Sequence, residues 1–389
     1  MSLEISLKDL ENVNPKLIAI FKREKLSLIK NIILNKYRTI SKFAKEINCN
    51  PSTLRFILNA KRNARIHLAR FITNKLNLEF NDVISKIVPS CRPKNSFIKP
   101  KGLPIIADVN IAKLVGHCFG DGHLSKEFSY TNKNKTLLRN LINYVNKLPI
   151  YNLTSNERYH GATIIRFSTL VRDILKAAGA PLGNKITKLY SIPAWIKNGD
   201  KEIKTSFLQA LFDDEGSVDV NHRVICFRLS KNVKLLYNLC DFMEDIKNML
   251  EEFGIKKVVI KGNRFYEGKN GKTIRKGLRI YGVRNFEFFK ERIGFSNPYK
   301  QVKLKKIIDN TQHLKLNREE RRKQVIELLK NKPFSDAIQI SNYIKMHHRA
   351  TLNFLNKMHR EGIISKVKSD KFWFQHKAPY QWYNKQIDD

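Results

Sequence analysis

The sequence reads LVGHCFGDG at residues 114–122 and LQALFDDEG at residues 208–216, and these two stretches decide the fold that we expect. Each has apolar residues at helical spacing, ends in small and acidic residues, and leads through a glycine into strand-like sequence. Asp121 and Glu215 take the same place in the two stretches, directly before the glycine. A pattern that returns along a chain indicates one structural unit used twice.

The sequence that follows each stretch also repeats. The first is followed by a strand-like piece near 123–130, a helix at about 134–147, the strand-like pieces YNLTSN and ATIIRFST, and the helix LVRDILKAAGA. The second is followed by SVDVN and RVICFRLS, a helix at about 232–253, KKVVIKG, KGLRIYGV and the helix FEFFKERIG. The order helix–strands–helix–strands–helix, present twice, predicts an α+β core over residues 105–312.

The two stretches resemble the paired motifs of the LAGLIDADG homing endonucleases, the DOD class. Two flanking blocks agree. GNKITKLYSIPAWI at 183–196 is similar to the segment before the family's second motif, and IGFSNPYKQVKL at 293–304 is similar to its closing block. The resemblance implies tandem LAGLIDADG repeats related by a pseudo-two-fold axis. It also implies a sequence-specific enzyme that makes metal-dependent double-strand cuts in DNA and works as a monomer.

The resemblance further implies that Asp121 and Glu215 are the catalytic carboxylates and hold the metal. Small residues at Gly116, Gly120 and Ala210 would let the two motif helices approach closely and bring both acids to one edge. Neighbouring carboxylates repel each other, and a divalent cation removes that conflict. Hard oxygen ligands with few protein contacts suit Mg²⁺, which would activate water at a phosphodiester.

Lysines near the scissile phosphates assist catalysis in members of the family. Lys188 and Lys300 are the expected counterparts here, with Lys185 and Lys303 as near alternatives. Tyr190 stands two positions before the Ile-Pro pair, where some members have a lysine. The assignment of the first lysine therefore stays open.

Other residues of the two motifs depart from the family pattern. His117 lies where an apolar residue is preferred, and we expect it to be packed or hydrogen-bonded rather than a metal ligand. Asp213 is expected to support the site from the helix end. The plain alternative for Asp121 and Glu215 is an acidic turn before a hairpin. Acids are disfavoured at helix C-termini, so their placement there in both repeats favours a site.

The strands of the two repeats would form a saddle on the DNA major groove, as the resemblance implies. Alternation places every second residue of a strand on one face, but the sequence leaves the phase open. Arginine suits guanine edges and phosphates. The candidates for DNA contact are Ser125, Arg166, Arg223, Arg228, Lys261 and Arg279.

Residues 1–90 are expected to be a helical domain, followed by a linker at 91–104. TISKFAKEINCNPSTLRFIL at 39–58 predicts two short helices joined by a turn, similar to repressor-like helix-turn-helix modules. Asn50 would cap the second helix and Pro51 would occupy its first turn. Ser52, Thr53 and Arg55 would then face DNA.

Residues 318–377 predict a second small module, followed by a tail at 378–389. RRKQVIELLKN, ISNYIKM and HHRATLNFLNKMHREG suggest three helices, and IISKVKSDKFWFQH suggests two strands, an order that resembles a winged helix. His348 and Arg349 fall near the start of its recognition helix. The alternative is a module for dimerisation or protein contact.

The charge of the chain indicates a polyanionic partner. Its 73 Lys and Arg against 35 Asp and Glu give a formal charge of +38, which makes double-stranded DNA the expected partner. No long apolar span or basic amphipathic anchor points to a membrane. The five cysteines lack a CxxC pair, which fits a cytoplasmic protein without a zinc module or disulfide framework.

Two other functions remain open at this point. A LAGLIDADG scaffold that has lost cleavage could serve as a transcription regulator, although such regulators tend to lose the acid pair that this chain keeps. An RNA-binding intron maturase would also suit the charge, but the two DNA-type modules count against it. The ends of the chain, Met1 and QIDD, lack splicing residues and lead us to expect a free-standing protein.

Overall fold

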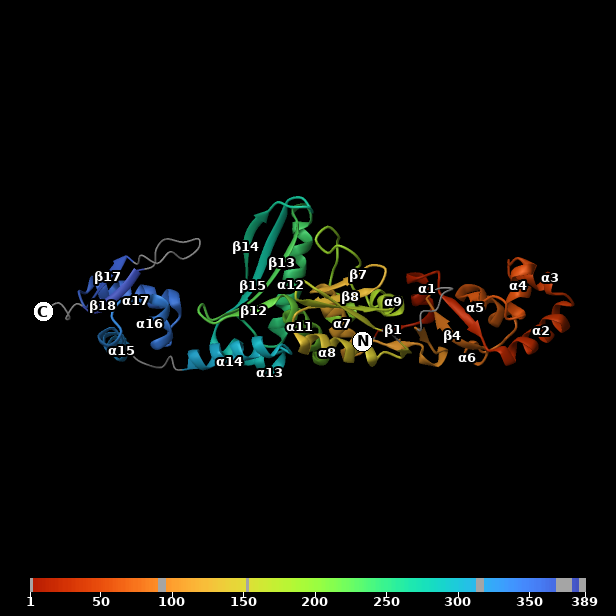
Figure 1. The fold of residues 1–389 in the computed structure, drawn as a ribbon, viewed down its shortest axis with the longest axis horizontal. Helices are drawn as coiled ribbons and strands as arrows, with labels where there is room; N and C mark the ends of the chain where they lie inside the picture. Colours follow the sequence, from red (N-terminus) through yellow and green to blue (C-terminus); the bar gives the residue numbers. More distant parts are fainter. Residues whose placement is uncertain (1–2, 90–95, 152–153, 313–317, 369–379, 385–389) are drawn as a thin grey trace. The chain divides into compact units, whose positions relative to one another are not determined.

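The computed structural model describes residues 3–89, 96–151, 154–312, 318–368 and 380–384 (Figure 1). The chain divides into two compact units. The first comprises residues 1–215, 231–245 and 266–274, and the second comprises residues 216–230, 246–265 and 275–389.

The N-terminal region of the first unit contains strands as well as helices. Its strands β2 to β5 join β9 (Ile150–Tyr151) in a five-stranded sheet of order β3-β2-β4-β5-β9, and β1 pairs with β6 (Ile105–Ile106), so the expectation of a purely helical region is corrected. The apolar, β-branched runs IAIF and ISKIV favour strands that are buried within a sheet.

The expected linker is also structured from residue 96 onward, because Phe97 and Ile98 pair with Tyr151 and Ile150. The elements are β1 (Glu4–Ile5), α1 (Leu7–Val13), β2 (Ile18–Phe21), α2 (Arg23–Tyr37), α3 (Ile40–Glu46), α4 (Pro51–Leu58), β3 (Ala64–Arg65), α5 (Ile66–Lys75), α6 (Phe80–Val83), β4 (Ile84–Val88), β5 (Phe97–Ile98) and the 3₁₀ turn η1 (Pro100–Gly102).

Helices α3 and α4 form the expected pair of short helices. The side chain of Asn50 accepts a hydrogen bond of 2.8 Å from the backbone N–H of Ser52, and Pro51 is the first residue of α4. Both capping predictions are therefore confirmed. The apolar faces of the two helices are buried, including Phe43 and Leu54.

The first repeat follows the expected order of helix, strands, helix, strands and helix. Its strands form a four-stranded antiparallel sheet of order β10-β11-β8-β7. The elements are β6 (Ile105–Ile106), α7 (Val109–Phe119), β7 (Gly122–Leu124), β8 (Phe128–Asn132), α8 (Lys135–Asn146), β9 (Ile150–Tyr151), β10 (Ser155–Tyr159), β11 (Ala162–Phe167) and α9 (Thr169–Ala177).

The second repeat has the same order. Its sheet has the order β12-β13-β15-β14, and β12 pairs antiparallel with β13 in the register Gly216 to Phe227. The elements are α10 (Ala194–Lys197), α11 (Lys201–Glu215), β12 (Gly216–Asp219), β13 (Val224–Asn232), the 3₁₀ turn η2 (Val233–Leu235), α12 (Leu236–Glu252), β14 (Val258–Tyr266), β15 (Thr273–Ile280), α13 (Val283–Arg292) and α14 (Pro298–Gln312).

The motif helices α7 and α11 pack closely within the first unit, and small residues make this possible. A Cβ atom added to Gly116 would lie 2.7 Å from the carbonyl oxygen of Phe207 and 2.9 Å from the Cβ of Ala210. A side chain at this position would therefore force the helices apart. The prediction that small residues allow close approach is confirmed.

The C-terminal region, in the second unit, has three helices and a three-stranded sheet of order β16-β18-β17. The expected tail contains β18, whose Trp382 is 1% exposed and belongs to the apolar core of this region. The second strand expected after Lys368 falls on 371–377, outside the described residues. The elements are α15 (Arg318–Asn331), β16 (Ser335–Asp336), α16 (Ala337–Tyr343), α17 (His348–Arg360), β17 (Ile364–Lys368) and β18 (Tyr380–Asn384). No helix within the described ranges has both the length and the apolar character needed to cross a lipid bilayer.

Candidate active site

Asp121 and Glu215 lie at the C-terminal ends of the two packed helices α7 and α11. Glu215 is the last residue of α11, and Asp121 follows α7 by two residues. Asp121 is exposed and its Oδ2 accepts a hydrogen bond of 2.9 Å from Asn132 Nδ2 on β8. Both carboxylates act electrostatically on the same ammonium group, that of Lys185. The structure thus brings the two acids into one neighbourhood.

A third acid, Asp214, joins the two repeats directly. Its carboxylate lies 3.0 Å from His117 Nδ1 and accepts hydrogen bonds of 2.6 Å from the Tyr130 hydroxyl and 3.1 Å from the backbone N–H of Asp121. The side chain of Asp214 is fully buried. A Cβ atom at Gly120 would collide with it, so glycine is required there.

Sequence reasoning missed this network. His117 takes an apolar position of the first motif, and Asp214 is an additional acid in the second motif, 97 residues away. A histidine and an additional acid in two helices that are expected to pack together are the signal that could have found the pair. Together they form a buried polar pair where α7 meets α11.

The Asp214 carboxylate controls the protonation of its partners. Burial by itself would lower the pKa of His117, but the charge of Asp214 and its hydrogen bond outweigh burial and raise that pKa. Burial, assisted by Asp214, raises the pKa of the Tyr130 hydroxyl well above its ordinary value. The prediction that His117 is hydrogen-bonded is confirmed.

Lys185 is the lysine that lies at this site. Its ammonium donates to the carbonyl oxygens of Cys118 at 3.1 Å and Gly122 at 2.9 Å, and also to that of Gly120. Burial lowers the pKa of Lys185, against the opposing pull of Glu215, Asp214 and Asp121. Three hydrogen bonds use all the donors of an ammonium group.

Lys188 and Lys300 are the two lysines expected to assist catalysis. Lys188 is exposed. Lys300, in the second unit, has its ammonium 5.9 Å from the centre of the Phe295 ring, and that of the alternative Lys303 lies 4.3 Å from the centre of the Tyr299 ring. Both roles therefore remain predictions.

A second buried lysine accompanies Tyr190. The ammonium of Lys231, on the inner face of β13, lies 3.3 Å from the centre of the Tyr190 ring and donates to Asn238 Oδ1. Burial lowers the pKa of Lys231 to about 8. Asn238 also binds both backbone groups of Tyr190, at 3.2 and 2.8 Å. The ammonium of Lys231 on β13 therefore lies beside Tyr190, the position where some family members carry a lysine.

The donors at the ends of α7 and α11 suit a hard divalent cation. Asp121 and Glu215 offer carboxylate oxygens, which are the ligands that Mg²⁺ prefers. Among the described residues, no group of three or more His, Cys, Asp or Glu side chains is arranged to hold a metal. A metal here would depend on water and substrate oxygens for the rest of its ligands, as Mg²⁺ commonly does.

The outer face of the second repeat's sheet is basic. Arg228 on β13 is exposed, its neighbours Phe227 and Leu229 are buried, and alternation fixes the phase that the sequence left open. Arg279 on β15 and the exposed Lys261 on β14 belong to the same sheet. Arg275, not among the predicted residues, donates to Ser230 Oγ at 3.1 Å on this face.

Two of the candidates for DNA contact in the first repeat lie on or beside its sheet. Ser125 is exposed in the turn between β7 and β8. Arg166 alternates with the buried Ile165 and Phe167, so it lies on the outer face. Its guanidinium is paired with Glu127 at 3.2 Å and Glu157 at 2.8 Å. DNA binding would have to compete with these two carboxylates.

The structure places Arg223 inside the second unit rather than on a free surface, which corrects its assignment to the DNA face. Arg223 is 6% exposed, and its guanidinium donates to the carbonyl oxygens of Lys345 at 2.7 Å and Ser341 at 3.4 Å. The ring of the adjacent His222 lies 5.9 Å from that of His348. His348 is therefore partly covered by the same hairpin, whereas Arg349 is exposed.

The predicted contact residues of the N-terminal region lie on the outer side of α4. Ser52 and Arg55 are exposed, Thr53 is partly exposed, and Arg55 donates to Ser41 Oγ at 3.3 Å. Thr53 also lines a pocket of about 290 Å³. The basic residues of that pocket are Lys61, Arg62 and Arg65.

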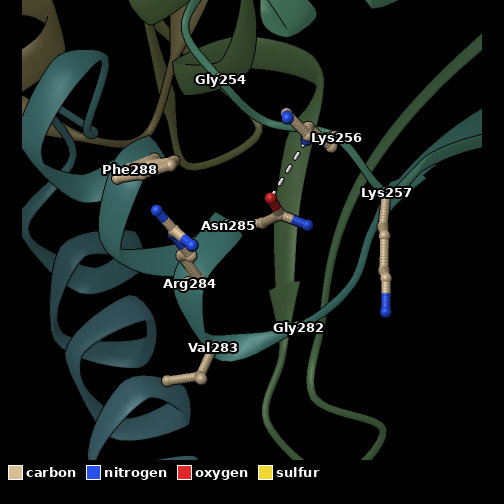
Figure 2. Close-up of a pocket in the computed structure, with 8 residues that line it drawn as sticks. All are labelled: Gly254, Lys256, Lys257, Gly282, Val283, Arg284, Asn285 and Phe288. Atoms are coloured by element: carbon tan, nitrogen blue, oxygen red, sulfur yellow. Dashed lines mark hydrogen bonds between the residues drawn. The ribbon is translucent and has the colours of Figure 1, made fainter.

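Another hollow, of about 420 Å³, lies in the second unit at the start of α13 (Figure 2). Its basic residues are Lys256, Lys257 and Arg284. The amide of Asn285 is used within the protein, because it accepts from the backbone N–H of Lys256 at 3.1 Å and donates to the carbonyl of Tyr281 at 2.6 Å. The lining of this hollow is therefore positively charged.

Comparison with known families identifies part of this arrangement. Residues 202–294 match the family model described as "LAGLIDADG-like domain". The match covers most of the second repeat, and the α+β fold expected from the sequence is confirmed as LAGLIDADG-type.

Similar sequences occur within much longer proteins. The chain is 30% identical over 217 residues to the tRNA-splicing ligase RtcB of Methanopyrus kandleri, which covers 49% of this chain and 21% of that protein. It is 34% identical over 139 residues to the DNA-directed RNA polymerase subunit Rpo1N of Methanocaldococcus jannaschii, which covers 34% of this chain and 10% of that protein. The chain thus spans about a fifth or less of the length of these relatives.

Two solved structures with a distant likeness to the chain are WhiA and a homing endonuclease. Full-length WhiA from Thermotoga maritima has a TM-score of 0.35 and 15% identity, over 65% of this chain and 90% of its own. A variant of the homing endonuclease I-DmoI has a TM-score of 0.32 and 16% identity, over 48% of this chain and 95% of its own.

Proposed function

We propose that this protein is a sequence-specific DNA endonuclease that makes metal-dependent double-strand cuts. The observation that carries the proposal is the placement of one acid at the end of each of two tightly packed helices, Asp121 after α7 and Glu215 on α11. One carboxylate for each repeat suits a duplex, whose two strands must both be cut.

The comparisons support an endonuclease of the mobile kind. The relatives have unrelated activities, as a tRNA-splicing ligase and an RNA polymerase subunit, and each match covers a small part of the relative. A segment shared by unrelated proteins behaves as an inserted element. Homing endonucleases spread in this way, by cutting DNA at the site of insertion.

Each group at the site has a role in this proposal. Asp121 and Glu215 hold the divalent cation, which supplies Lewis acidity and an activated water when bound. Asn132 fixes the orientation of the Asp121 carboxylate through its hydrogen bond of 2.9 Å. The arginines of the β13–β15 face bind the phosphates and base edges of DNA and hold the duplex in place.

The experiment that tests the proposal is incubation of the full chain with a randomised duplex library and Mg²⁺, followed by sequencing of the cut ends. We expect an enriched sequence at the ends that EDTA abolishes. A library that stays uncut while the protein still binds DNA would contradict the proposal.

A second candidate function is a DNA-binding regulator on the same scaffold. The observation that favours it is the Asp214 network, because this third carboxylate is bound by three groups of the protein itself, His117, Tyr130 and the backbone of Asp121. A regulator would bind DNA equally well in EDTA, whereas an endonuclease needs the metal to cut.

The basic face of the second repeat provides a prediction about affinity. Replacement of Arg228, Arg275 and Arg279 by alanine should weaken DNA binding and lower the dependence of log affinity on log salt by about 0.9 for each lost phosphate contact. Titration of DNA at several salt concentrations measures both effects. Arg139→Ala, an exposed arginine on α8, is the control. An unchanged salt slope in the triple variant would remove this face from the DNA interface.

We further propose that α4 reads DNA, and the structure determines how this should be tested. Deletion of residues 1–90 would remove β2 and β4 from a sheet that also contains β9, and would break the 2.7 Å bond between Asn14 and Asp173. The double variant Ser52→Ala/Arg55→Ala leaves that core intact. We expect it to lower affinity for the specific site about tenfold or more, because each lost base contact costs about 1–3 kcal/mol. Equal affinity to the control Lys8→Ala would assign α4 to another role.

A further inference from the structure

The acidic ends of α7 and α11 already contain a cation, the ammonium group of Lys185. It is held by three backbone carbonyls, those of Cys118, Gly120 and Gly122, which surround the end of α7. The last carbonyls of a helix carry partial negative charge and attract cations. The location of Lys185 is therefore that of a cation bound at a helix C-terminus.

The same ammonium is within electrostatic range of acids from both repeats. Asp121, Asp214 and Glu215 all act electrostatically on Lys185. The Asp214 side chain is fully buried, so its charge is weakly screened by water. Three acids gathered at one place would repel one another, and a positive charge at Lys185 offsets that repulsion.

The hydrogen bonds of Lys185 distinguish this role from that of a mobile catalytic lysine. All three N–H donors are used by carbonyls, so the ammonium could reach a phosphate only by giving up a bond. Lys188, three residues later, is exposed. The two lysines of one segment thus differ in exposure.

We propose that Lys185 is a built-in cation that neutralises the acidic ends of the two motif helices, so that the core is stable without a divalent metal. The inference rests on the α7–α11 geometry and does not depend on the proposed cutting of DNA. If the ammonium is removed, the three carbonyl oxygens that it bound remain near the carboxylates of the two repeats and could bind another cation. Such hard oxygens suit Ca²⁺, which tolerates irregular ligand arrangements.

The test is thermal melting of the full chain without DNA, in EDTA and in millimolar Ca²⁺. In EDTA we expect Lys185→Met to melt about 5 °C or more below wild type, since it removes the donor of three carbonyls and the positive charge beside the acids. Ca²⁺ should restore at least half of that loss and should shift wild type by much less. Lys188→Met is the matched control and should melt as wild type in both buffers.

A further variant, Lys185→Arg, keeps the charge and should show no greater response to Ca²⁺ than wild type. Either of two results would overturn the proposal. One is a Lys185→Met protein that melts as wild type in EDTA. The other is a Lys185→Met protein, folded or unfolded in EDTA, that Ca²⁺ does not stabilise beyond its effect on wild type. Cutting plays no part in these measurements, so its absence would leave the inference standing.

Discussion

Asp121→Asn and Glu215→Gln should each lower double-strand cutting by about 10²–10³-fold or more, while DNA affinity stays within a few-fold of wild type. Each substitution keeps the shape of the side chain and removes its charge, which weakens the hold on a divalent cation. In the proposed function, the loss falls on the step at the phosphodiester because a bound metal would supply charge stabilisation there. Duplex binding would depend instead on the basic face of the second repeat's sheet, which neither substitution alters.

The measurement is single-turnover cutting of the enriched duplex in Mg²⁺, with binding measured in Ca²⁺. Asp82→Asn, an exposed acid on α6, is the matched control and should cut as wild type. Variants that cut like wild type would move the site elsewhere. The two repeats also allow a finer outcome, because a variant that cuts only one strand would assign its acid to that strand.

Asp214→Ala should destabilise the core by about 3–5 kcal/mol, the typical cost of removing one partner from a buried polar pair. The substitution leaves His117 and the Tyr130 hydroxyl buried without the acceptor that they share. It also removes the carboxylate that binds the backbone N–H of Asp121. Urea unfolding measures the loss. Glu157→Ala removes an exposed acid that is paired with Arg166 and should cost less than about 1 kcal/mol.

The same network predicts how stability depends on pH. The pKa of His117 is raised in the folded protein above its ordinary value of 6.5. Its contribution to stability should therefore be fully present below about pH 6.5 and be lost as the pH rises through the raised value. Asp214→Ala should remove this pH dependence. Equal pH profiles in wild type and variant would show that His117 does not take up a proton in the fold.

The sequence by itself determined the repeat, the α+β class and the two acids. These follow from local patterns: apolar spacing sets the helices, alternation sets the strands, and an acid before glycine marks the end of each motif helix. The caps at Asn50 and Pro51 could be predicted for the same reason, since they depend on residues within a few positions of each other.

Only the tertiary structure decided which groups surround those acids. Asp214 meets His117 and Tyr130 across 97 and 84 residues of sequence, and Lys185 reaches carbonyls 63 to 67 residues away. The structure also shows that Arg223 is buried. It shows which face of β13 points outward, with Arg228 exposed and Lys231 buried. The physical reason is that charge and desolvation act through space. A carboxylate or ammonium acquires its role from neighbours that only the packing of α7 against α11, and of each sheet on its helices, brings within reach.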